Sequence, residues 1–552
     1  MQGFIVTQSW LVLLPPLFVL CVAYFTHNIL ISLLVGVTSA GLIATNFSII
    51  DTGLLIFSYI KKNITDPDVL CMIGFAFMLG ATIALINYTG GACALGKLIT
   101  KKLKEARDAE SASLFLSLLL CVDDYLSSLT VGCLMQPLTD KFKIPRTKLA
   151  FLINTMASPL VVLVPVSTWI GIIVKQLGSS GLSIEYAKTF REHIHFPGGV
   201  VDIAQKIVIH SDPFYTYLKS VPFLFYSFIV IIGTWFIVRR RISYGPMHTH
   251  ERIAQQTGNL YGGQAPRFCA MQMQTTGTTH LSDFFVPIVT LVFATIAGLP
   301  ISGYLYGAQT FWESFKFAKI FPVMLIASIL AFVFGCILAL IRKKIAIKHV
   351  IFFEWSGIQL MYQSAIIIFS AIIFSDLLDK KLLTGVYIAK LIIPYVSLHW
   401  VPLITFLITS IVALSTGSSW GTIFIMTPIS IQLVGTLSGL PSPIALPDIY
   451  ILLPTIGAVI SGSIAGAQIS PIADPVTISS TSAGCYQIDH VRTQIPYVLP
   501  AILGACASFT AAGFLKINGP TITALVCLAI GIAVSLSIIS ILNILARKTQ
   551  KS

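Results

Sequence analysis

Two adjacent aspartates, Asp123 and Asp124, follow the stretch 114–122, which is apolar except for Ser117. A carboxylate inside a bilayer is costly unless it is paired, hydrated or bound to a cation, so such residues usually mark ion pathways. The pair therefore predicts a cation site in which Asp123 and Asp124 bind Na⁺. If the turn is helical, the two side chains point about 100° apart, so one faces the ion and the other orients the turn. The structural alternative is that backbone amides satisfy both carboxylates.

Oxygen atoms from other segments could complete this site, because hard cations prefer oxygen ligands. Ser127 follows the aspartates by about one helical turn. Ser158 and Ser470 each precede a proline, and a helix break at a proline frees backbone carbonyls. Further candidates come from the polar cluster 415–421 and from the segment after Ser470. The full set is Asp123, Asp124, Ser127, Ser158, Thr416, Ser418, Ser419, Ser470, Asp474 and Thr477.

Asp474 has a second interpretation that needs no ion. It precedes Pro475, and an acidic N-cap followed by proline at the first helical position is a frequent helix start. The sequence leaves capping and cation binding equally open, and one carboxylate could serve both roles.

Composition places these residues in a membrane protein. Of 552 residues, 55% are hydrophobic and only 10% are charged, whereas soluble domains are roughly 25% charged. A membrane-crossing helix needs about 20 apolar residues. The sequence predicts an all-α polytopic membrane protein with about eleven transmembrane helices and two re-entrant hairpins. The predicted spans are 6–25, 28–50, 69–96, 149–174, 216–238, 284–308, 320–341, 350–375, 450–482, 494–515 and 521–546.

The first hairpin is predicted at 112–137 because basic residues flank this segment on both sides. Five lie between Lys97 and Arg107, and four between Lys141 and Lys148. Basic loops favour the cytoplasmic face, so the segment enters and returns on one side instead of crossing. Arms of about twelve residues reach roughly 18 Å, just past the middle of a core about 30 Å thick. Both aspartates would then lie at the tip.

This topology also accounts for the net charge of +13. It places 22 of the 35 lysines and arginines in cytoplasmic segments, where they contact anionic membrane lipids. The predicted location is the cell membrane, with the N-terminus outside and the C-terminus cytoplasmic. Nucleic acid is not an expected partner, since no basic stripe is interleaved with exposed aromatic residues. The segment 382–398 is predicted to be interfacial; if it spans, the C-terminal topology inverts.

The stretches 111–168 and 401–478 share one layout. Each begins with an apolar hairpin that has a polar tip, and each continues into a span with a Ser-Pro pair, at Ser158-Pro159 and Ser470-Pro471. The first hairpin enters from inside and the second from outside. This pattern predicts an inverted repeat, the architecture in which substrate binds at mid-membrane between broken helices. Within the second repeat, a break is expected between 466 and 475.

The predicted organisation of the chain follows from these two repeats. The segments are the N-terminal helices (1–68), the first repeat (69–238) with its hairpin (112–137), a cytoplasmic loop (239–283), connecting helices (284–349), the second repeat (350–515) with its hairpin (401–436), and a C-terminal helix and tail (516–552).

The chain is not predicted to be an enzyme. It lacks the signatures of intramembrane proteolysis and of diphosphate chemistry, and its ten cysteines form no Cys-x-x-Cys pair. The cysteines are therefore interpreted as reduced core residues. No cofactor is expected besides Na⁺ and H⁺ as transported or coupling ions.

Several longer motifs resemble the NhaC-type sodium/proton antiporter family over roughly 70–515. These motifs are Val122-Asp-Asp-Tyr125, Leu129-Thr-Val-Gly132, Pro137-Leu-Thr-Asp140, Ser167-Thr-Trp169, Ser415-Thr-Gly-Ser-Ser-Trp-Gly-Thr422, Ser470-Pro-Ile-Ala-Asp474 and Ile488-Asp-His-Val-Arg-Thr-Gln494. The resemblance implies membership of the ion-transporter superfamily, with two hairpins in an inverted repeat. It also implies a homodimer.

The sequence departs from the family pattern at three places. Gly466-Ala-Gln-Ile469 stands where the family usually has Gly-Asp-His, so one probable ion-site carboxylate is replaced. Ser127 and Gln136 stand where the family usually has Asn and Arg. These departures bear on the proton stoichiometry and on the substrate.

The function predicted from these residues is exchange of Na⁺ for H⁺ by a secondary transporter. A buried carboxylate holds either a proton or a cation, and the loaded neutral forms reorient more readily than the empty anion. The alternative is Na⁺-coupled transport of a small organic acid or amino acid, whose carboxylate would bind at half-helix N-termini.

Overall fold

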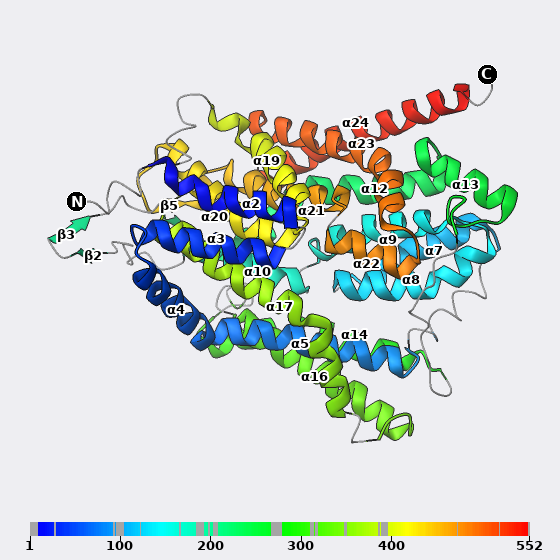
Figure 1. Ribbon diagram of the computed structural model, residues 1–552, viewed down its shortest axis with the longest axis horizontal. Helices are drawn as coiled ribbons and strands as arrows, with labels where there is room; N and C mark the ends of the chain where they lie inside the picture. The colour runs from blue at the N-terminus through cyan, green and yellow to red at the C-terminus, as the bar shows by residue number, and fades with distance from the viewer. Residues whose placement is uncertain are drawn as a thin grey trace.

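A computed structural model shows a molecule built almost entirely of helices (Figure 1). The structure describes residues 9–26, 29–91, 94, 104–121, 123–164, 167–183, 193–196, 199–202, 208–265, 279–309, 314, 318–346, 350–382, 384, 387, 396–471, 473–517 and 519–549. Most of the predicted interfacial segment 382–398 lies outside these residues. Its prediction is therefore neither confirmed nor contradicted.

The first repeat consists of a hairpin and a broken span. Helices α7 and α8 are separated by the short break 120–123 and pack against each other, so the chain reverses as predicted (Figure 1). After the hairpin comes a span that is broken into α9 and α10. Helix α9 continues through Pro159 and ends at Val161, so the break comes slightly later than the predicted Ser-Pro position. The helices are α7 (Ala106–Leu119), α8 (Asp124–Lys141), α9 (Arg146–Val161) and α10 (Thr168–Ser179).

The second repeat has the same order of elements. Its hairpin turns at 417–418, and its broken span is interrupted at 470–473, inside the predicted interval. Gly417 ends the first arm in the left-handed conformation, with φ of 67°, which glycine adopts without strain. The elements are η4 (Leu398–Trp400), α19 (Val401–Thr416), α20 (Ser419–Ser438), α21 (Leu452–Ile469) and α22 (Asp474–Ala483).

The two repeats exchange their broken spans. Helix α22 of the second repeat packs against α8 and α9 of the first, while α10 of the first packs against α20 of the second. Each hairpin therefore lies beside the second half of the other repeat's broken helix. This reciprocal packing agrees with the predicted inverted repeat, and it brings both hairpins to one interface.

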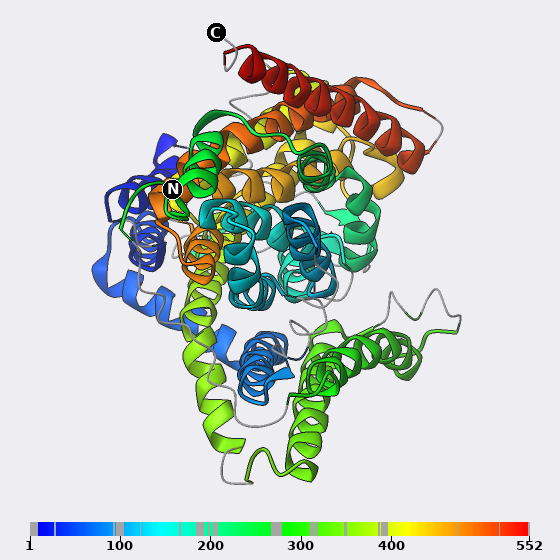
Figure 2. The ribbon, with the colours of Figure 1, turned by 90° about the vertical axis from the view of Figure 1, so that its right-hand side faces the viewer.

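A separate group of helices lies to one side of the repeats (Figure 2). Helix α5 packs against α16 and α17, α14 packs against α16, and α17 also contacts α3 and α20. The elements of this part are η1 (Trp10–Leu13), α2 (Leu14–Thr26), α3 (Ile29–Ala44), α4 (Ile49–Thr65), α5 (Pro67–Tyr88), α14 (Ser282–Leu305), α16 (Ile320–Ile341) and α17 (Val350–Lys380).

The remaining elements are two small sheets, short helices and three long helices that pack against the repeats. A small sheet has the order β1-β4-β5 with parallel pairing, and β2 pairs with β3 antiparallel. Figure 1 places β5 and α13 at opposite ends. These elements are β1 (Leu182–Ser183), β2 (His193–Phe196), β3 (Gly199–Asp202), β4 (Ile209–His210), α11 (Pro213–Ser220), η2 (Val221–Phe223), α12 (Phe225–Arg240), α13 (Gly245–Thr257), β5 (Ile444–Ala445), η5 (Leu446–Asp448), α23 (Gln487–Phe514) and α24 (Pro520–Thr549).

The described residues contain eight helices that are long and apolar enough to cross a membrane, or up to nine if a pair bent by 42° is one span. The sequence predicted about eleven. Part of the difference lies at the N-terminus, where the apolar helices Trp10–Val19 and Leu30–Ala44 are shorter than a full crossing. The chain is thus an all-α, multi-pass membrane protein, as predicted.

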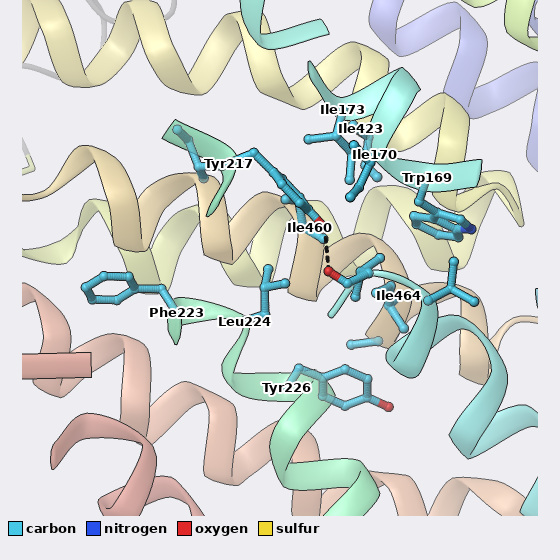
Figure 3. Packing of buried hydrophobic residues seen from close by; sticks show 14 of the residues in the cluster. Trp169, Ile170, Ile173, Tyr217, Phe223, Leu224, Tyr226, Ile423, Ile460 and Ile464 are labelled. Atoms are coloured by element: carbon cyan, nitrogen blue, oxygen red, sulfur yellow. Dashed lines mark hydrogen bonds between the residues drawn. The ribbon is translucent and has the colours of Figure 1, made fainter. Parts of the chain in front are cut away.

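The main core lies where the repeats meet (Figure 3). Trp169 of α10, Ile423 of α20 and Ile464 of α21 are buried within it. Tyr217 of α11 is also fully buried, and its hydroxyl donates to the backbone carbonyl of Val162, just after α9 ends. Side chains from both repeats and from α11 therefore fix the break between α9 and α10.

Close backbone contact between α19 and α21 depends on glycine. A Cβ at Gly466 would lie 2.0 Å from the backbone oxygen of Ser410 and 2.8 Å from Cβ of Ala413. A Cβ at Gly462 would lie 2.7 Å from the backbone oxygen of Phe406. Small residues commonly permit such approach between membrane helices. Gly466 thus holds the broken span against the second hairpin.

We expect Gly466→Ala to destabilise the protein, because the added methyl group overlaps α19 and overpacking costs about 1–3 kcal/mol. The matched control is Gly53→Ala in α4, where a Cβ meets nothing within 4 Å. That change should be neutral or stabilising by about 0.5–1 kcal/mol. Thermal unfolding of purified protein in detergent measures both. Equal melting temperatures for the two variants would contradict the proposed tight contact.

Candidate ion-binding site

The two aspartates lie at the turn of the first hairpin. Asp123 belongs to the break, and Asp124 is the first residue of α8. Their exposed fractions are 3% and 4%, so both side chains are buried. The backbone carbonyl of Asp123 accepts from the amide of Ser127 at 3.0 Å, which closes the first turn of α8. The predicted placement of the pair at a hairpin tip therefore agrees with the structure.

Asp124 is the acid with the clearer set of contacts. The Ser158 hydroxyl donates to its Oδ2 at 3.1 Å, which joins the hairpin to α9. The Trp169 indole lies beside the same carboxylate. Neither Oδ1 of Asp124 nor Nε1 of Trp169 has a hydrogen-bond partner among the described residues. One carboxylate oxygen is thus anchored, and the other is available to a ligand.

Further buried oxygens lie on α8 and at the start of α10, and they too have no hydrogen-bond partner among the described residues. They are the hydroxyls of Ser127 and Thr130 on α8 and of Ser167 at the start of α10. Leaving a buried polar atom unpaired typically costs about 1–3 kcal/mol. Hydroxyl and carboxylate oxygens are suitable ligands for a hard cation. The described residues contain no group of three or more His, Cys, Asp or Glu that could hold a metal ion.

The electrostatics of the tip favour a positive ligand. The charge that acts on the Asp124 carboxylate is that of the neighbouring Asp123, which has the same sign. Two like charges so close together in a buried place cannot both remain ionised without compensation. A proton or a cation supplies that compensation.

Asp474 approaches this tip from the second repeat. The Tyr125 hydroxyl donates to its Oδ2 at 3.3 Å, so the residue after Asp124 connects the hairpin to α22. The capping interpretation expected Asp474 at the N-cap. Instead the N-cap is Ala473, and Asp474 lies in the first turn. Its half-buried carboxylate interacts favourably with the positive end of the helix dipole and contacts the first hairpin.

Most polar side chains at the second hairpin tip make hydrogen bonds to backbone groups and so stabilise the turn. Ser418 accepts from the amide of Gly421 at 3.0 Å, which caps α20. Thr416 accepts from the amide of Ser418 at 3.3 Å, and Ser419 donates to the carbonyl of Ser463 at 3.2 Å. These three predicted site residues are buried. Because each hydroxyl already has a structural role, only its remaining acceptor capacity could serve an ion.

The last two predicted ligands make hydrogen bonds to other groups. Ser470 donates to the carbonyl of Leu414 at 2.8 Å and so fixes the break of the second repeat to its own hairpin. Thr477 is exposed; it donates to the carbonyl of Ala473 at 3.0 Å and accepts from Gln487 at 2.7 Å. The structure therefore groups Asp123, Asp124, Ser127 and Ser158, and it does not bring Thr477 to them.

Two tryptophans connect the tips, and the sequence analysis gave neither a role. The rings of Trp169 on α10 and Trp420 on α20 lie 4.7 Å apart between centroids, tilted by 41°. Because Trp169 also lies beside Asp124, it bridges the first hairpin to the second. Both residues occur in the motifs shared with the antiporter family. Their place in these motifs was the only indication in the sequence that they have a role.

A second buried polar cluster surrounds Gln468 of α21. Its amide nitrogen donates to the carbonyl of Asn154 at 2.8 Å, and its amide oxygen accepts from the Tyr226 hydroxyl. The Gln494 amide nitrogen donates to the carbonyl of Gln468 at 2.7 Å. Since backbone carbonyls only accept, both glutamine amides have a defined orientation.

These orientations determine the rest of the cluster. The Gln494 oxygen accepts from the Asn154 amide nitrogen at 3.2 Å, and that nitrogen also faces Nε2 of His490 at 3.5 Å. Nε2 is therefore an acceptor, and a neutral His490 carries its proton on Nδ1. Asn154 lies one turn before Ser158 on α9. The cluster thus fixes α9, α12, α21 and α23 next to the Asp124 contact.

Comparisons with known proteins agree with this architecture. The sequence profile of the Na⁺/H⁺ antiporter family matches residues 196–514. An uncharacterized protein of Haemophilus influenzae is 25% identical over 518 residues, which cover 91% of this chain and 90% of that protein. The malate-2H⁺/Na⁺-lactate antiporter of Bacillus subtilis is 29% identical over 141 residues, which cover 24% of this chain and 28% of that protein.

One solved structure shows a similar fold. The crystal structure of the Alcanivorax borkumensis YdaH transporter, described as having an unusual topology, matches with a TM-score of 0.52. The match covers 83% of this chain and 88% of that one at 16% identity. At this identity the likeness concerns the fold alone.

We expect Gln468→Leu to destabilise the protein, because it leaves the Tyr226 hydroxyl and the Asn154 carbonyl without these partners in a buried place. The expected loss is about 1–3 kcal/mol, measured by thermal unfolding. Gln256→Leu on the exposed face of α13 is the matched control and should have little effect. Equal stability of the two variants would show that the cluster does not hold the helices.

Proposed function

Because the chain belongs to the Na⁺/H⁺ antiporter family, we propose that it exchanges Na⁺ for H⁺ through Asp123 and Asp124. The family consists of multi-pass membrane transporters rather than enzymes. The observation that supports this site most directly is the buried Asp124 carboxylate. Ser158 holds one of its oxygens, and the other has no hydrogen-bond partner among the described residues.

Exchange follows from competition for one buried negative charge. Asp124 binds either a proton or Na⁺. Repulsion from the neighbouring Asp123 carboxylate makes binding of a positive ligand more favourable. The neutralised forms pass through the low-dielectric interior more easily than the bare anion. The site therefore returns loaded with the other ion, and net movement of one ion requires counter-movement of the second.

The hydroxyls have different roles in this proposal. Ser127 and Ser167 supply oxygens to Na⁺, because both are buried and without hydrogen-bond partners among the described residues. Ser158 orients the carboxylate. Thr416, Ser418, Ser419 and Ser470 keep the second hairpin and its broken helix in shape. Asp474 acts through Tyr125, and Thr477 does not touch the ion.

We also propose which end of the protein faces the cytoplasm and which membrane holds it. Arg239, Arg240 and Arg241 end α12 beside α13, and basic residues favour the cytoplasmic face. The α13 end is then cytoplasmic and the β4–β5 end is outside. The protein resides in the cell membrane, with the N-terminus outside, its C-terminus cytoplasmic, and its basic loops against anionic lipids. It forms a homodimer, as the family resemblance implies.

A second candidate function is Na⁺-coupled transport of a small organic acid or amino acid. It is favoured by the local similarity to a malate-2H⁺/Na⁺-lactate antiporter. The N-termini of α8 and α22 meet at the hairpin tip, where helix dipoles favour a substrate carboxylate. Proteoliposomes distinguish the two functions. A Na⁺ gradient that changes lumenal pH without solute supports the antiporter, whereas a response only after malate, lactate or an amino acid is added supports the second candidate.

We expect Asp124→Asn and Asp123→Asn each to lower Na⁺/H⁺ exchange at least about tenfold, because an amide cannot alternate between a proton and a cation. The measurement is the Na⁺-driven pH change in proteoliposomes of purified protein. Asp51→Asn in the exposed first turn of α4 is the matched control. Near-normal exchange by both hairpin variants would remove the proposed site.

Competition also predicts the pH dependence of Na⁺ transport. At pH values where the site is protonated, the Na⁺ concentration for half-maximal rate should rise about tenfold for each unit of falling pH, by mass action for one competing proton. The maximal rate at saturating Na⁺ should change less. Initial rates over a matrix of Na⁺ and pH test this. A half-saturating concentration independent of pH would contradict a shared site.

A further inference from the structure

A large cavity lies at the end of the molecule that carries β4 and β5. Its volume is about 670 Å³, in the range of pockets that bind small organic molecules. Segments far apart in the sequence form its wall: α11 and η2, the start of α21, and the junction of α23 with α24. Representative lining residues are Tyr215, Lys219, Phe223, Tyr450, Leu453 and Lys516.

Two lysines give the cavity its charge. Neither Lys219 nor Lys516 has an ion-pair partner among the described residues. Instead the Lys516 ammonium lies 5.0 Å from the ring centroid of Tyr450, and the Lys219 ammonium lies 5.4 Å from that of Tyr215. Asp212 also lines the cavity, but its Oδ1 accepts from the amide of Tyr215 and caps α11. The cavity therefore offers two ammonium groups to an anion.

Most of the remaining wall is apolar. Phe223, Leu453 and Leu515 line the cavity together with several prolines. On the neighbouring outer surface, Leu218 is 37% exposed, Ile517 is 38% exposed and Ile522 is 51% exposed. The cavity therefore adjoins an exposed apolar surface.

The cavity is distant from the ion site. It is lined by the first turn of α21, whereas the break beside Gln468 and Ser470 lies at the other end of that helix. The helix has 18 residues, which corresponds to about 27 Å. A ligand in the cavity therefore does not share the aspartate site, although it contacts the helix that leads to it.

We propose that this cavity binds an amphipathic anion. A carboxylate or phosphate contacts Lys219 and Lys516, and an apolar body lies against Phe223, Leu453 and the residues near Ile517. Two sources have this chemistry: an anionic phospholipid of the membrane and a soluble fatty acid. The cation–aromatic contacts hold the lysines toward the cavity in its absence, so little rearrangement accompanies binding.

The test uses the full-length protein, purified in detergent and freed of lipid. Phosphatidylglycerol, octanoate and the zwitterionic phosphatidylethanolamine are added separately, and binding is followed by native mass spectrometry and by the rise in melting temperature. The variant is Lys219→Gln with Lys516→Gln. The matched control is Lys61→Gln with Lys104→Gln, two exposed lysines outside the cavity. Lys219→Arg with Lys516→Arg keeps the charge.

Phosphatidylglycerol or octanoate should bind the unchanged protein, the control and the arginine variant, with at least tenfold weaker binding to the glutamine variant. Binding of phosphatidylglycerol alone identifies a lipid as the source, and binding of octanoate alone identifies a soluble acid. Equal binding to the glutamine variant, equal binding of phosphatidylethanolamine, or no binding of either anion would overturn the proposal. The readouts do not involve transport, so they are independent of the proposed exchange.

Unfolding of the glutamine variant would be recognised from its melting curve without ligand. In that case the arginine variant tests the proposal, because loss of anion binding by the arginine variant overturns it.

Discussion

The structure depends on the cost of burying negative charge at the first hairpin tip. Asp123 and Asp124 lie within a few per cent of full burial, and their mutual repulsion adds to the desolvation of each. No hydrophobic packing can offset this while both are ionised. The protein responds with specific dipoles: the Ser158 hydroxyl, the start of α8 and the nearby Trp169 indole. Of these groups, the Ser158 hydroxyl holds one oxygen of Asp124, and the other oxygen has no hydrogen-bond partner among the described residues.

The reciprocal packing of the repeats places the site at the interface between them. Tyr125 ties the first hairpin to Asp474 of the second repeat, and Trp169 ties it to Trp420 of the second hairpin. The two carboxylates therefore lie where contacts from both repeats meet. The cluster around Gln468 and Asn154 is different in kind, because backbone carbonyls orient the amides of Gln468 and Gln494. It joins the helices next to the hairpin without any charged group.

The fold could be predicted from the sequence to a large extent. Apolar length located the helices, basic loops on both sides of 112–137 required a chain reversal, and glycines with prolines located the break at 470–473. The break after α9 came later than its Ser-Pro pair, since a proline near a helix end need not terminate it.

By itself, the sequence determined which charges must be buried and on which segments, because a carboxylate within an apolar run has few alternatives to an ion or a proton. Only the tertiary structure decided which oxygens surround that charge. The Ser158 hydroxyl donates to Asp124. Ser418 instead caps α20, and Ser470 donates to the carbonyl of Leu414. Thr477 lies at the surface. A hydroxyl looks the same in sequence whether it binds an ion or a neighbouring carbonyl. Its role is set by distance and direction to the atoms of the helices packed around it.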